Sequence, residues 1–92
     1  MAETKTLLVG LMDYRDTLGR HIQQMDEEFQ SLNRMWSQFE MVYHGDAAYE
    51  FKSLWMRTSM FFQDYMERTR RILQVLEERI AALQILDHSS ST

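Results

Sequence analysis

The sequence predicts an all-α fold in which two helices form an antiparallel hairpin. The chain has 92 residues, no proline and only three glycines, so it lacks the turn signals that an all-β domain needs every 8 to 12 residues or so. Apolar residues recur along it in alternating steps of three and four, which is the spacing of one helix face. It has no cysteine, which excludes disulfides and zinc–thiolate sites. We therefore expect a single helical-hairpin domain over residues 1–88.

The first helix is expected over residues 6–42, approximately. Gly10 and Gly19 fall inside this pattern, and each would cost about 1 kcal/mol relative to alanine. We therefore expect the N-terminal part of this helix to fray. The apolar seam of the helix consists of Leu8, Leu11, Leu18, Ile22, Met25, Phe29, Leu32, Trp36 and Phe39, with Arg15 as its polar interruption.

A turn is expected at residues 43–46 and a second helix over residues 47–87, approximately. Gly45 can adopt a positive φ at no steric cost, and the Asp46 side chain can cap the first free amides of the helix that follows. Residues 89–92 are expected to be a disordered tail. The seam of the second helix is expected at Ala48, Phe51, Trp55, Phe62, Tyr65, Ile72, Leu76, Leu83 and Leu86, with Thr58, Thr69 and Arg79 in the remaining positions.

The second helix carries more apolar surface than one seam uses. A further row beside the seam contains Leu54, Phe61, Val75 and Ala82. Large apolar patches usually mark interaction sites, and the core of so small a domain rarely stabilises it alone. We therefore expect dimerisation into a four-helix bundle, with the partner interface at Leu54, Phe61, Phe62 and Val75.

The centre of the chain carries a more specific pattern. Tyr43-x-Gly45 is followed by Ala47, Phe51 and Trp55 at two, six and ten residues after the glycine. In this pattern and in its length, the chain resembles the WXG-type, ESAT-like small proteins of bacterial type VII secretion, which have a Trp-x-Gly turn near mid-chain. Tyr43 replaces the tryptophan, and its ring with a polar edge can still pack and hydrogen-bond there. The turn at Tyr43 and Gly45 has two interpretations, a plain connector between the helices and a recognition surface, because loops at the end of a rigid scaffold commonly carry function.

The resemblance also implies export. Secreted members often carry Tyr-x-x-x-Asp/Glu, or a Phe variant, beyond the second helix, but here Tyr65 is followed by Thr69 at that spacing. Leu83 with Asp87 is the nearest late candidate for a degenerate export signal. Its plainer interpretation is a seam residue followed by a solvated helix end. The first residues lack the features of a standard signal peptide.

What the resemblance implies is a non-enzymatic substrate or co-secreted partner of a type VII system. Such a protein is cytoplasmic before export and is then secreted or associated with the cell surface. Its implied partners are a second copy of the chain, a sister hairpin, the helical N-terminal domain of a larger secreted effector, and the secretion ATPase.

Composition argues against several other classes. An enzyme with a metal site in a helical bundle would use Glu-x-x-His pairs, and no such pair occurs, so we expect no catalytic residues, no metal and no cofactor. With 14 acidic and 10 basic residues the net charge is -4, which disfavours nucleic-acid binding. No apolar run approaches the roughly 20 residues of a membrane-spanning helix. A cytoplasmic adaptor or dimerisation coiled-coil module, unconnected with secretion, remains the alternative.

Overall fold

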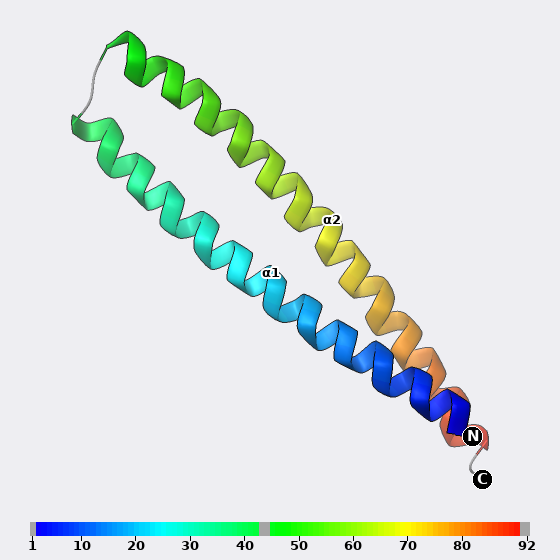
Figure 1. Ribbon diagram of the computed structural model, residues 1–92. Coiled ribbons are helices and arrows are strands. Elements are labelled where there is room, and N and C mark those ends of the chain that lie inside the picture. Colours follow the sequence, from blue (N-terminus) through cyan, green and yellow to red (C-terminus); the bar gives the residue numbers. More distant parts are fainter. Residues whose placement is uncertain (1, 43–44, 91–92) are drawn as a thin grey trace. The chain divides into compact units, whose positions relative to one another are not determined.

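The computed structural model describes residues 2–42 and 45–90, and this part of the chain is all-α (Figure 1). Helix α1 spans Ala2–Val42 and helix α2 spans Asp46–Ser90. The described ranges contain no strand. The predicted all-α helical hairpin is thus confirmed. Tyr43, assigned to the recognition turn, lies outside the described residues.

Both helices are longer than the sequence pattern indicates. α1 begins at Ala2, ahead of the expected residue 6, although Gly10 and Gly19 lie within it. The Leu8 side chain is buried close to this end, and burial of a leucine contributes about 1.5–3 kcal/mol, more than one glycine costs. α2 ends at Ser90, two residues into the expected tail. The other two residues of that tail lie outside the described ranges.

The start of α2 is organised by Gly45. This glycine has φ 108°, in the left-handed region that favours glycine. The Tyr49 N–H donates a hydrogen bond to the Gly45 carbonyl at 3.1 Å, so Gly45 stands where a cap residue stands and Asp46 is the first helical residue. The prediction that Asp46 is the cap is wrong by one position. Its carboxylate still lies in the first turn, where negative charge interacts favourably with the helix dipole.

The residues divide into two compact units, each built from parts of both helices. We call them the terminal unit, whose described residues are 2–22 and 69–90, and the turn unit, whose described residues are 23–42 and 45–68. Leu8, Ile22 and Ile80 are buried in the terminal unit. Trp36 and Met66 are buried in the turn unit.

The predicted seam of α1 agrees with the structure. Within their own units, its apolar positions and Arg15 are buried or half-buried, except for Leu32, which is exposed. A single three-and-four spacing fits this helix, because the neighbouring positions are mostly polar.

The predicted seam of α2 is half wrong in the turn unit. Trp55 and Phe62 face the interior as expected. However, Ser59 is half-buried in place of the expected Thr58, and Met66 is buried in place of the expected Tyr65. Met66 is 4% exposed and Tyr65 48%. Burying the tyrosine would require a hydrogen-bond partner for its hydroxyl, whereas methionine fills an apolar gap without one.

The terminal unit departs from the predicted seam in the same way. Leu73 is half-buried and Ile80 is 2% exposed, while Ile72 and Arg79 face solvent. A seam through Arg79 would desolvate a guanidinium, at a large cost unless it is paired. Leu86 is likewise exposed although the seam was expected to include it.

Candidate protein-binding surface

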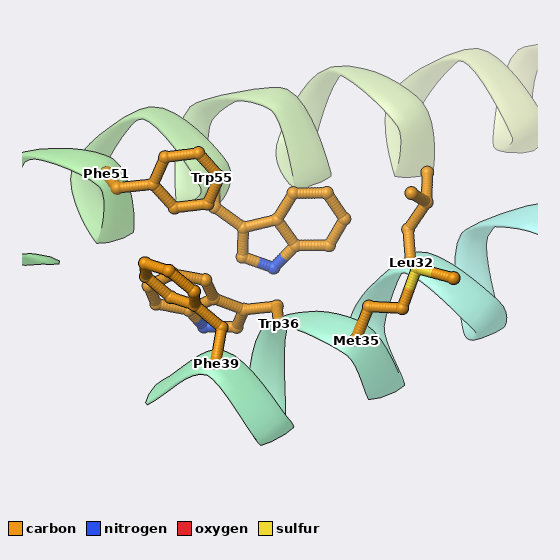
Figure 2. Close-up of a pocket in the computed structure, with 6 residues that line it drawn as sticks. All are labelled: Leu32, Met35, Trp36, Phe39, Phe51 and Trp55. Carbon is orange, nitrogen blue, oxygen red and sulfur yellow. The ribbon is translucent and has the colours of Figure 1, made fainter. Parts of the chain in front are cut away.

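Three aromatic rings of the turn unit pack against one another close to the turn. The Trp36 ring lies 5.5 Å from Phe39 and 5.2 Å from Phe51, and the Phe39 and Phe51 centroids are 5.4 Å apart. Trp36 and Phe39 come from α1, and Phe51 comes from α2 (Figure 2). Aromatic pairs at such separations contribute about 0.5–1.5 kcal/mol beyond their burial. This cluster therefore joins the two helices near the turn.

A second aromatic group continues the packing along the same unit. Phe29 of α1 stacks against Trp55 at 6.1 Å and 15°, and against Phe62 at 5.9 Å and 29°. Phe62, expected at the partner interface, is thus half-buried inside the hairpin. Its contact with Phe29 gives it a role in joining α1 to α2.

An apolar groove of about 280 Å³ opens beside the aromatic rings. In Figure 2 the Trp55 indole has the Trp36, Phe39 and Phe51 rings on one side. The Leu32 and Met35 side chains lie on its other side. No titratable group lines the groove, so it can accept an apolar side chain but offers no acid, base or nucleophile. Its lining residues are Leu32, Met35, Trp36, Phe39, Phe51 and Trp55.

The outward side of α2 in the turn unit carries a second row of apolar residues. Leu54 is 59% exposed and Phe61 is 76% exposed, as expected for residues assigned to a partner interface. They belong to a longer set at alternating steps of three and four, which is the spacing of a coiled-coil seam. This set, called the outer stripe below, consists of Phe51, Leu54, Thr58, Phe61 and Tyr65. All five are exposed, although Phe51 at the start of the set also packs against Trp36 and Phe39.

Charged residues of alternating sign border the outer stripe. Glu50, Arg57 and Asp64 follow one another at seven-residue intervals, and all three are exposed. Asp64 accepts a hydrogen bond from Arg68, one turn further along α2. A depression of about 320 Å³ lies at the start of the stripe, lined by Glu50, Leu54, Arg57 and two neighbours. The charge of the border therefore alternates from negative at Glu50 to positive at Arg57 and negative at Asp64.

An ion pair between Lys52 and Glu40 links the two helices of the turn unit. The Lys52 Nζ lies 3.1 Å from the Glu40 Oε1. Both side chains are about half exposed, so the pair stabilises the hairpin by at most about 1 kcal/mol. Its main effect is on the alignment of α1 and α2 near the turn.

The remaining predicted site residues lie in the terminal unit, apart from Gly45 at the turn. Val75 is half exposed. Leu83 and Asp87, the candidate degenerate export pair, are both half-buried and lie four residues apart on α2. They occupy the inner positions of this helix, which fits the interpretation of Leu83 as a seam residue. The interpretation of Asp87 as a solvated helix end is wrong, because its Oδ1 atom is buried.

The described ranges contain neither a cluster of metal ligands nor a membrane-spanning helix. No group of three or more His, Asp or Glu side chains there could hold a metal ion. None of the helices described is long and apolar enough to cross a membrane. No protein-family model, curated protein or solved structure matches the chain.

Sequence reasoning missed the groove and the alternating border. The groove depends on the packing of α1 against α2, which no pattern along one helix contains. The border could have been found, because the three-and-four spacing of the outer stripe places Glu50, Arg57 and Asp64 each one residue before a stripe position.

Proposed function

We propose that this chain is a non-enzymatic substrate or co-secreted partner of a bacterial type VII secretion system. It pairs with itself, with a sister hairpin or with the helical N-terminal domain of a larger secreted effector. The secretion ATPase is a further proposed partner. No catalytic residue, cofactor or metal takes part in this function.

The observation that carries the proposal is the exposure of large apolar side chains outside the hairpin interior. Leu54 and Phe61 face solvent in the turn unit, although burying one such side chain contributes about 1.5–3 kcal/mol. Exposed apolar side chains at helical spacing are the means by which amphipathic helices bind one another. Support for the secretion context comes from the Gly45 turn, followed by Ala47, Phe51 and Trp55.

An export assay tests the secretion context. The chain is expressed in a bacterium with a working type VII system, with and without its neighbouring genes, and the culture medium is probed for it. Because the Tyr-x-x-x-Asp/Glu pair is missing, we expect export only in the presence of a partner. Export of the chain alone, persisting after deletion of residues 83–92, would show that the signal is not supplied by a partner.

A cytoplasmic adaptor is the second candidate. The absence of the Tyr-x-x-x-Asp/Glu export motif favours this candidate. Four residues after Tyr65 the chain has Thr69, which is buried, instead of an acidic residue. An adaptor would use the same apolar surface without leaving the cell. Retention of the chain in the cell under every export condition, together with stable binding of a cytoplasmic helical protein, would favour the adaptor.

A further inference from the structure

The outer stripe of the turn unit has the spacing of a coiled-coil seam. Phe51 at its start also packs against Trp36 and Phe39 of α1, whereas Leu54 and Phe61 further along face solvent. Its members alternate by three and four residues over two heptads, and Leu54 and Phe61 are its most exposed aliphatic and aromatic side chains. In coiled coils, the charges beside such a seam decide the partner and the orientation. The border of Glu50, Arg57 and Asp64 therefore carries information about what covers the stripe.

We propose that the outer stripe pairs with the outer stripe of a second copy of this chain, antiparallel, in a register set by Arg57 and Asp64. The proposal rests on the proposed function, because it names one partner for the same surface. In an antiparallel helix pair, border positions of the same type lie opposite one another across the seam. A two-fold axis between Thr58 and Phe61 brings Arg57 of each copy to Asp64 of the other.

The same register gives complementary layers between the two helices. Thr58 lies opposite Phe61 of the other copy, and Leu54 lies opposite Tyr65. Phe51 lies opposite Arg68, whose guanidinium can rest on the ring as a cation–π contact. The Arg68 side chain is 70% exposed while it contacts Asp64, so it is available at the surface for this contact.

The alternation of charge rejects the neighbouring registers. A shift of one heptad in one direction places Arg57 against Arg57 and Glu50 against Asp64. The opposite shift places Asp64 against Asp64. Like charges across a seam are a common means of excluding wrong pairings, so a second copy meets attraction in one register and repulsion in the two beside it.

Two charge reversals test the register in the full-length chain. Arg57→Glu and Asp64→Arg each turn both symmetric contacts from attractive to repulsive. At low salt, each variant is expected to self-associate about tenfold more weakly than the unmodified chain, as measured by sedimentation over a concentration series. High salt should reduce the difference.

Mixing the two variants should restore pairing. In the mixed dimer, the introduced glutamate of one variant faces the introduced arginine of the other. The second symmetric contact keeps the unmodified pair of Arg57 and Asp64. Both contacts are then attractive, so a heterodimer should form and be detected by native mass spectrometry.

A matched control is Arg34→Glu. This reversal changes the net charge by the same amount as Arg57→Glu, and Arg34 is exposed on α1 midway between the seam positions Leu32 and Trp36, on the opposite face of that helix. It should leave self-association unchanged. Circular dichroism checks that each variant keeps its helix content. Asp64→Lys replaces Asp64→Arg in the mixture if the latter has lost helix.

The outcomes separate the register from the proposed function. If the unmodified chain dimerises but the reversals have no effect, or the mixture gives no heterodimer, the register is wrong and pairing through another face stands. If the unmodified chain is a monomer at every concentration, the second copy is not the occupant. The export test then decides the proposed function independently.

Discussion

Glycine has opposite consequences at two positions of this chain. Gly45 has φ 108°, whereas Gly10 lies within α1, and a Cβ added at either position would meet no atom within 4 Å. A methyl group at either position would therefore have free space, and the two positions differ only in their backbone conformation. Gly45→Ala is expected to lower the free energy of unfolding by about 1–3 kcal/mol. Gly10→Ala is expected to raise it by about 0.5–1 kcal/mol. Urea unfolding followed by circular dichroism measures both.

Gly45→Asn gives an internal check on this pair. Asparagine tolerates positive φ better than alanine does, so the free energy of unfolding of this variant should fall between those of Gly45→Ala and the unmodified chain. Equal effects of alanine at positions 10 and 45 would show that the turn in solution does not require a positive φ.

Tyr43 is assigned to recognition on the basis of the resemblance alone, and its role stays a prediction. Tyr43→Ala should leave the melting temperature and self-association largely unchanged while impairing export or effector binding. Tyr43→Trp should be tolerated. Thermal melting beside a binding titration measures the two properties on the same samples. A Tyr43→Ala variant as unstable as Trp55→Ala would identify the tyrosine as a packing residue.

The helix α2 shows that two seams can overlap on one element. In the terminal unit, Ile80 is buried while its neighbour Arg79 faces solvent. Ile80→Ala is therefore expected to cost about 2–5 kcal/mol, and Arg79→Ala to change stability by no more than about 0.5 kcal/mol. Chemical denaturation of the two variants compares adjacent positions of one helix. A larger loss of stability for Arg79→Ala than for Ile80→Ala would support the seam through Arg79 that was expected from the sequence.

The same element shows what a sequence pattern can and cannot determine. The all-α class and the inner positions of α1 could be predicted, because a single three-and-four spacing is available there. On α2, steps of three or of four after Trp55 and Phe62 both reach plausible residues. Met66 is buried instead of Tyr65 because desolvating a methionine side chain costs less free energy than desolvating a tyrosine hydroxyl. The groove beside Trp36 depends on contacts between the helices and has no signal in either helix alone.

At the scale of the whole molecule, two adjacent phenylalanines should have different effects. Phe61 is 76% exposed on the outer stripe, whereas Phe62 stacks against Phe29 within the turn unit. Phe61→Ala should weaken self-association and leave the hairpin itself stable to within about 0.5 kcal/mol. Phe62→Ala should destabilise the hairpin by about 1.5–3 kcal/mol.

Melting temperatures over a concentration series distinguish the two effects. The melting temperature of a dimer rises with protein concentration by mass action. This dependence should be present in the unmodified chain and reduced in Phe61→Ala. If the two variants behave alike, the stripe and the interior are not separate surfaces.

The placement of the two tryptophans gives the molecule a selective optical probe. Trp36 and Trp55 are the only tryptophans in the sequence, and both belong to the turn unit. Tryptophan fluorescence, excited where tyrosine does not absorb, therefore responds to the environment of that unit alone. The ellipticity of the backbone, in contrast, is a property of every helical residue. Coincident fluorescence and ellipticity transitions would indicate one cooperative unfolding event. Loss of ellipticity before any change in emission would mean that the terminal unit opens first, leaving the indoles packed.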